Sequence, residues 1–129
     1  MKEFRVVLSN RPGELARVAT ALARQGVSLK AVAATAHSNQ VTVHLVGHDV
    51  ESTRAGLEAA AIPFDEHEVL SVLLEDKAGE LAKIAGALAD AGVNLNAIYL
   101  AGRADDLVEI VVAADDTKKA KKILGESAI

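Results

Sequence analysis

The chain contains the same stretch of sequence twice. At an offset of 66 residues, segment 13–32 aligns with segment 79–98. Identity holds at Gly13, Glu14, Leu15, Ala16, Ala19, Ala21, Leu22, Ala23, Gly26, Val27, Leu29 and Ala31. A duplication this dense predicts that one structural unit occurs twice.

Length and composition limit how such halves can fold. The chain has 129 residues, half of them hydrophobic, but its only aromatic residues are Phe4, Phe64 and Tyr99. The core is therefore expected to consist of Ala, Val, Leu and Ile. A half of about 60 residues is only marginally stable alone, so the two domains, 1–67 and 68–129, are expected to share a core, a sheet or a dimer interface.

Charge and residue usage exclude several classes of function. The net charge of −4 argues against a nucleic-acid partner, and the lysines at 118, 119, 121 and 122 are interpreted as a solvated helix face. The absence of cysteine excludes disulfides and thiolate chemistry. No signal peptide or membrane-spanning run is visible, so the expectation is a cytoplasmic protein with no membrane partner.

Hydrophobic periodicity predicts β-α-β-β-α-β in the first half. Strands are expected at 4–8, from 27 toward 35, at 41–46 and at 62–67, with a hairpin turn at 37–40. A first helix has its apolar stripe at Leu15, Val18, Ala19 and Leu22, and ends before Gly26. A second helix is expected at 50–61, capped by Asp49 or Ser52.

The second half repeats this plan but ends early. Strands are predicted at 69–75, 93–101 and 107–113, helices at 79–91 and 117–125, and a turn at 102–106. From the third strand the offset becomes 67, so this hairpin is one residue longer. Only Glu126 to Ile129 remain for a fourth strand, which is expected to be short or missing and to leave an open edge for a partner subunit.

This order predicts an α+β fold of two ferredoxin-like βαββαβ units, each an antiparallel sheet with its helices on one face. No catalytic constellation, nucleotide-binding loop or cofactor site is visible. His44 and His48 lie on a strand and its exit, which does not favour a metal pair.

The loop between the first strand and first helix of each half is the candidate site. Gly13 and Gly79 allow close approach to the backbone, and the helix N-terminus favours an anion such as a carboxylate. Asn94 and Asn96 could add hydrogen bonds to an amine or amide. The alternative is that Asn10 and Asp76 only cap their helices and that Gly79 only allows tight packing.

The motif Asp76-x-x-Gly79-x-Leu81-Ala82, followed by an Ala/Leu helix and Gly92-Val93-Asn94-Leu95-Asn96, resembles the ACT domain. This small regulatory module binds amino acids between paired domains in, for example, aspartokinases and phosphoglycerate dehydrogenases. The first half resembles it through Asn10, Pro12, Gly13, Leu15, Ala16, Gly26, Val27 and Leu29. The resemblance is therefore to a tandem ACT protein.

The resemblance implies ligand-binding residues in both halves. They are Asn10, Arg11, Pro12, Gly13, Glu14 and Leu15, and Asp76, Lys77, Ala78, Gly79, Glu80, Leu81, Asn94, Leu95 and Asn96. Ser28 and Lys30 replace Asn94 and Asn96 in the first half, so the second-half loop is favoured as the carboxylate and amine site. Glu75 and Lys77 are interpreted as solvated charges rather than as the rim of the site.

The expected function is that of a non-enzymatic, dimeric, allosteric regulator that binds an amino acid and modulates a partner, without a cofactor or metal. The alternative is an obligate regulatory subunit of a biosynthetic enzyme, because segment 70–75 resembles the opening of the acetohydroxyacid synthase small subunit. A weaker alternative is a transcription-control module like the glycine-cleavage repressor.

Overall fold

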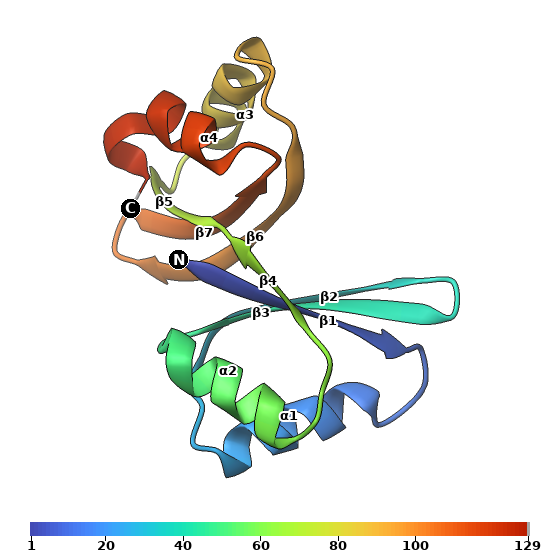
Figure 1. The fold of residues 1–129 in the computed structure, drawn as a ribbon. Coiled ribbons are helices and arrows are strands. Elements are labelled where there is room, and N and C mark those ends of the chain that lie inside the picture. The colour runs from blue at the N-terminus through green and yellow to red at the C-terminus, as the bar shows by residue number, and fades with distance from the viewer. Residues whose placement is uncertain (129) are drawn as a thin grey trace. The chain divides into compact units, whose positions relative to one another are not determined.

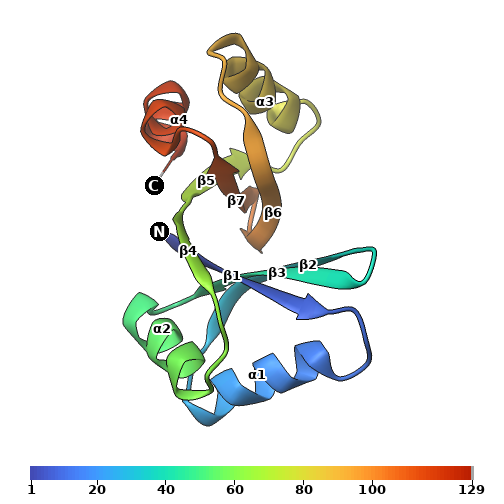
Figure 2. The same cartoon turned by 45° about the vertical axis from the view of Figure 1, so that its right-hand side comes forward.

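The computed structural model describes residues 1–128 and divides into two compact units. One unit comprises Lys2–His67, and the other comprises Met1 and the chain from Glu68 onward. Both are α+β units of ferredoxin-like type with an antiparallel sheet and two helices (Figures 1 and 2).

The first unit has the predicted order of elements. They are β1 (Lys2–Ser9), α1 (Glu14–Arg24), β2 (Leu29–His37), β3 (Gln40–Gly47), α2 (Val50–Ala59) and β4 (Asp65–Glu68). The strand order is β2-β3-β1-β4, and α1 and α2 cover one face of the sheet. The predicted strand at 62–67 is wrong at its start, because Pro63 and Phe64 precede β4 and Ile62 is buried in the core.

The second unit has the same order without the last strand. It consists of β5 (Leu70–Glu75), α3 (Glu80–Asp90), β6 (Leu95–Ala104), β7 (Leu107–Ala114), α4 (Thr117–Leu124) and a 3₁₀ turn at Gly125–Ser127. The sheet order is β5-β7-β6, so β5 and β6 are edge strands. Within the described residues, the predicted short fourth strand is reduced to a single bridge between Val72 and Ala128.

Alternation along the strands decides which side chains enter each core. Phe4, Val6 and Leu8 on β1 and Val43 and Leu45 on β3 are buried under the helices of the first unit. Leu70, Val72, Leu74, Ile110 and Val112 occupy the corresponding positions in the second unit. The predicted equivalence of residues 41, 43 and 45 to residues 108, 110 and 112 is therefore confirmed, because each set lies opposite the same positions of the first strand of its own unit.

The helices bury a narrower stripe than the sequence predicts. Val18 and Leu22 are buried on α1, and Ile84 and Leu88 on α3. Leu15, expected on the apolar face, is 45% exposed, and its equivalent Leu81 is 55% exposed. The first turn of each helix thus projects an aliphatic side chain toward solvent, beside the candidate loop.

The extra residue of the second hairpin lies in a strand and not in the turn. Both hairpins have two-residue turns, Ser38-Asn39 and Asp105-Asp106, so the predicted turn at 102–106 is too long. The additional residue forms an irregularity in β6 between Leu100 and Gly102. This bulge changes which side chains β6 presents just before its end.

Candidate functional site

The candidate loop joins β5 to α3, and its geometry is repeated between β1 and α1. Gly79 is the N-cap residue of α3 with φ 93° and ψ −14°, and Gly13 has φ 90° and ψ −12° at the start of α1. No side chain caps either helix. Apart from the amide of Glu80, which donates to Lys77 O at 3.5 Å, the amide groups of these first turns are taken up by no side chain, and they lie at the positive end of the helix dipole.

The alternative that Gly79 merely allows tight packing is wrong. A Cβ built on Gly13 or Gly79 meets no atom within 4 Å. What requires glycine is the positive φ, which other residues adopt only at a cost.

The alternative that Asn10 and Asp76 cap the helices is wrong as well. The backbone amide of Asn10 donates to Asn39 O at 2.8 Å, and its side-chain amide donates to Ser38 O at 3.2 Å. The backbone amide of Asp76 donates to Asp106 O at 2.7 Å. Both residues fasten their loop to the tip of the neighbouring hairpin.

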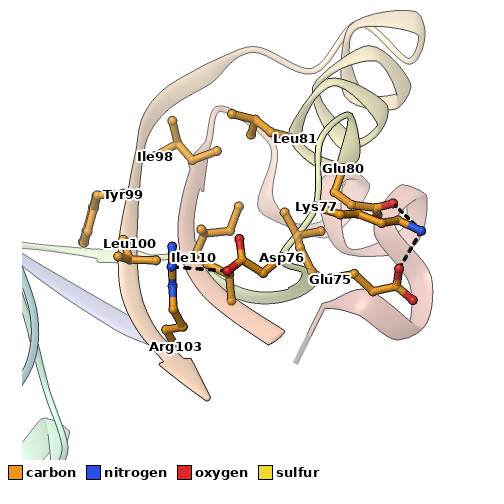
Figure 3. Close-up of a pocket in the computed structure, with 12 residues that line it drawn as sticks. Glu75, Asp76, Lys77, Glu80, Leu81, Ile98, Tyr99, Leu100, Arg103 and Ile110 are labelled. Atoms are coloured by element: carbon orange, nitrogen blue, oxygen red, sulfur yellow. Dashed lines mark ion pairs between the residues drawn. The ribbon is translucent and has the colours of Figure 1, made fainter. Parts of the chain in front are cut away.

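The second unit has an open pocket of about 320 Å³ beside this loop (Figure 3). Four of the sequence-predicted site residues line it: Asp76, Lys77, Glu80 and Leu81. The other lining residues are Leu74, Glu75, Ile98, Tyr99, Leu100, Arg103, Val108 and Ile110. The loop, the first turn of α3 and the edge strand β6 thus form one concave surface.

The pocket combines aliphatic walls with an ion pair. Arg103 Nη1 lies 3.2 Å from Asp76 Oδ2, and both side chains are partly exposed to solvent. Figure 3 shows this pair next to Leu100, with Leu81 and Ile98 at the other end of the pocket. This ion pair and several aliphatic groups therefore face the same space.

The remaining loop charges interact with one another. Lys77 Nζ lies 2.7 Å from Glu75 Oε2 and 3.7 Å from Glu80 Oε1. The hydrogen bond from Lys77 lowers the pKa of the Glu75 carboxyl, and the same bond raises the pKa of Lys77. In Figure 3 this group lies away from Arg103, so the Asp76–Arg103 pair is the charged feature closest to the aliphatic wall formed by β6.

Five predicted residues of the second half do not line the pocket: Ala78, Gly79, Asn94, Leu95 and Asn96. Asn94 exchanges two hydrogen bonds of 3.0 Å with Asp115, through its backbone amide and its carbonyl oxygen. Leu95 packs against the core. Asn96 is exposed at an irregularity in β6, between Leu95 and Ala97.

The predicted residues of the first half lie on an exposed loop and helix start. Glu14 is within 3.7 Å of Arg11 and 3.3 Å of Arg17. A separate cavity of about 490 Å³ in this unit is lined by α1 and the segment after α2, and none of residues 10–15 contributes to it. The two hollows thus involve different elements, and neither Asn94 and Asn96 nor the Ser28 and Lys30 that replace them line either one.

Sequence reasoning missed the β6 wall of the pocket: Ile98, Leu100 and Arg103. Ile98 and Leu100 pair with Val112 and Ile110, which places them on the helix-covered face of the sheet, yet they remain 39% and 53% exposed. The signal was a second apolar alternation beyond Asn96, together with an arginine that has no counterpart in the first half.

One further polar cluster lies in the first unit. The buried carboxylate of Glu3 accepts a hydrogen bond from Arg5 Nη2 at 2.7 Å and lies 2.7 Å from His44 Nδ1. Among residues 1–128, no three potential metal ligands are grouped together. In the same residues, no helix is both long and apolar enough to cross a membrane.

The chain was compared with known proteins. The family model of the ACT domain matches residues 69–127, slightly under half of the chain. A search of curated proteins found no match.

Solved structures share the fold. A protein from Bacteroides thetaiotaomicron is similar with a TM-score of 0.86 at 20% identity, over 95% of this chain and 85% of that one. The regulatory subunit of aspartate kinase from Thermus thermophilus has a TM-score of 0.66 at 16% identity, over 98% of this chain and 91% of that one. A structure of aspartokinase alpha and beta subunits has a TM-score of 0.65 at 17% identity, over 98% and 90%.

These likenesses extend over nearly the whole chain, whereas the family match covers only the second unit. The chain therefore has two ferredoxin-like units, and residues 69–127 form one ACT domain.

Proposed function

We propose that this chain is a non-enzymatic regulator made of two ACT domains, 1–67 and 68–129, that binds an amino acid and modulates a partner protein. The first unit repeats the fold order, the glycine geometry and much of the sequence of the second. These features support a tandem arrangement, although the family match covers one unit. No catalytic residue, metal or cofactor is part of the proposal.

The observation that carries this proposal is the pocket at the β5–α3 loop. It lies inside the ACT domain and combines a helix start without a side-chain cap, an aspartate, an arginine and an aliphatic wall. An α-amino acid has the complementary groups: a carboxylate, an ammonium and a side chain. Pockets of roughly 300–1,000 Å³ hold small ligands, and this one is at the small end of that range.

The pocket at the β5–α3 loop determines which residues are proposed to bind the ligand. Asp76, Lys77, Glu80 and Leu81 line the pocket, with Ala78 and Gly79 shaping its loop. Asn94, Leu95 and Asn96, and the first-half residues Asn10, Arg11, Pro12, Gly13, Glu14 and Leu15, are proposed to contact ligand only where a second ACT domain pairs beside them. Leu15 and Leu81, both exposed, support such pairing.

Regulation would proceed by a population shift. A ligand held between paired domains favours the paired arrangement by its differential affinity for that arrangement. A homodimer is the simplest source of the second domain, because β2 and β6 are unpartnered edges of their sheets. The resemblance in fold to a regulatory subunit of aspartate kinase supports a metabolic enzyme as partner.

An obligate regulatory subunit is the second candidate. The edge at β5, which within residues 1–128 pairs on its outer side through one bridge at Ala128, is a surface that a catalytic subunit could complete. Copurification of an enzyme, without stabilisation of the isolated chain by any amino acid, would favour this candidate.

Thermal unfolding of the purified chain against each of the twenty amino acids tests the proposal. A ligand that binds only the folded state stabilises it by RT ln(1 + [L]/Kd), about 2.7 kcal/mol at a hundredfold excess over Kd. For a chain of this size we expect the unfolding midpoint to rise by several degrees with one or a few amino acids. Unchanged midpoints across the panel would contradict the free-standing sensor.

A further inference from the structure

We infer that the pocket of the second unit selects α-amino acids with an aliphatic side chain, and that Asp76 and Arg103 hold the ammonium and carboxylate groups of the ligand. This inference rests on the proposed function and adds the ligand class and the residue that recognises the carboxylate. It depends on three observations: an exposed aliphatic wall, a separable ion pair, and the absence from the first unit of side chains equivalent to Asp76, Leu100 and Arg103.

The aliphatic wall is exposed at a cost. Leu81, Ile98 and Leu100 are 55%, 39% and 53% exposed, and all three line this pocket. Each square ångström of apolar surface covered by a ligand contributes on the order of 25 cal/mol. A ligand with an aliphatic side chain covers this wall, whereas a charged or strongly polar side chain would lose hydration against it.

The Asp76–Arg103 pair is suited to open around a zwitterion. Its atoms are 3.2 Å apart, and the side chains are 42% and 61% exposed. Solvent-exposed ion pairs contribute little to stability, so separating this one costs little. The guanidinium can then bind a carboxylate through two parallel hydrogen bonds, and Asp76 can accept from the ammonium. The ligand replaces one exposed ion pair by two.

The first unit shows that the fold does not need these groups. Arg103 pairs with Val108. The first-unit counterpart of Val108 is Val41, and it pairs with Ala36. Leu100 pairs with Ile110. The first-unit counterpart of Ile110 is Val43, and it pairs with Ala34. Asn10 occupies the place of Asp76.

The first unit therefore has the same loop, glycine and hairpin, and keeps Leu15 and Val32 exposed at the places of Leu81 and Ile98. It has no side chain equivalent to Asp76, Leu100 or Arg103. The bulge between Leu100 and Gly102 changes the register just before Arg103, which has Ala36 as its counterpart. A structural requirement of the fold would be expected in both units. Because Asp76, Leu100 and Arg103 have equivalent side chains in neither the loop nor the strand of the first unit, their presence in the second unit points to a ligand.

The test is titration calorimetry of the full chain with leucine, isoleucine and valine, and with aspartate, lysine and threonine. Aliphatic amino acids are expected to bind at least about tenfold more tightly than the polar ones. Leucinamide, which lacks the carboxylate, and 4-methylpentanoate, which lacks the ammonium, are expected to bind more weakly than leucine. Selective binding of a polar amino acid would overturn the inference and leave the proposed function intact, whereas no binding by any amino acid would overturn both.

Two variants locate the contacts. Arg103→Gln and Asp76→Asn each remove one charge-assisted contact and are expected to weaken leucine binding by roughly ten- to a hundredfold. Lys122→Gln removes an exposed positive charge from α4, outside the pocket, and is the matched control. Unchanged affinity in Arg103→Gln, with thermal stability like that of the control, would overturn the inference even if leucine binds.

Discussion

Glycine serves different purposes at different positions of this chain. Gly13 and Gly79 have φ near 90° at helix starts, with free space where a Cβ would be. Gly86 lies inside α3, where positive φ is not required and a Cβ also meets nothing within 4 Å. Replacing glycine by alanine should therefore introduce backbone strain at Gly13 and Gly79 but improve helix propensity at Gly86.

Alanine substitutions separate the two effects. Gly13→Ala and Gly79→Ala are each expected to lower the free energy of unfolding by about 1–2 kcal/mol, the cost of a left-handed conformation for a residue with a Cβ. Gly86→Ala is expected to raise it by roughly 0.5–1 kcal/mol, because alanine is the better helix former. Chemical denaturation measures all three, and a neutral Gly79→Ala would show that the loop does not need its positive φ.

Gly47 serves close packing instead. A Cβ at Gly47 would lie 1.9 Å from Thr53 Oγ1, which donates to Asp49 O at 2.7 Å and belongs to a fully buried side chain. The second unit has Ala114 and Ala120 at the equivalent positions. A larger residue on the strand thus accompanies a smaller one on the helix.

This exchange predicts a coupled pair. Gly47→Ala alone is expected to destabilise the chain by about 1–3 kcal/mol through overpacking. The double variant Gly47→Ala, Thr53→Ala is expected to recover part of that loss, giving a non-additive double-mutant cycle. Denaturant midpoints of the four proteins check this, and strict additivity would show that the two residues do not compete for space.

At the scale of elements, α2 and α4 begin with the same kind of cap. For α2 the sequence predicted Asp49 or Ser52 as the capping residue, and Asp49 is the one that caps it. Asp49 accepts from the amide of Ser52 at 2.9 Å, and Asp116 accepts from the amide of Lys119 at 3.0 Å. Helices α1 and α3 have no such cap. The two helices without a side-chain cap are therefore those that begin at the candidate loops.

Helix α2 is tied to β4 by ion pairs. Arg54 donates to both carboxylate oxygens of Glu66, with Nη2 at 3.0 Å from Oε2, and also to Glu51 at 2.8 Å. The hydrogen bond from Arg54 lowers the pKa of Glu66 below its ordinary value of 4.5. A carboxyl with a depressed pKa stabilises the folded state above its ordinary pKa, and this contribution is lost as the pH falls through the lowered value.

Acid unfolding tests this link. We expect the unfolding midpoint of the chain to fall as the pH drops below about 4.5. Glu66→Gln should lower the midpoint at pH 7 and make the acid dependence shallower, because one titrating group is gone. Glu58→Gln removes an exposed carboxylate from α2, the helix that carries Arg54, and should leave the dependence on pH steep. Identical profiles for the two variants would contradict a stabilising role for the Arg54–Glu66 pair.

The edge strand β6 shows why the candidate site was predicted only in part. The repeated motif located the loop at 76–81, because glycine, leucine and the helix start recur in sequence. Arg103 and Leu100 reach the pocket through strand pairing and a bulge, neither of which is encoded in a local pattern. Non-local pairing therefore supplied the half of the pocket that the sequence did not reveal.

At the scale of the whole molecule, the duplication predicted the fold well. Two α+β units with the same order of elements, and strands with one buried face, were expected from the alignment of the halves and are present. The family match covers 69–127 alone, and the groups that distinguish the second unit are those of its pocket. Duplication followed by divergence would leave one half with a site and the other with the scaffold.

The measurement that tests this account most directly is amide NMR of the full chain during titration with leucine. We predict that the resonances that shift most belong to 76–81 and 98–103, whereas the equivalent loop at 10–15 shifts less. The comparison is internal, because both loops have the same fold and the same glycine geometry. Shifts concentrated at 10–15, or no shifts with leucine or any other amino acid, would contradict the claim that the second unit senses an amino acid.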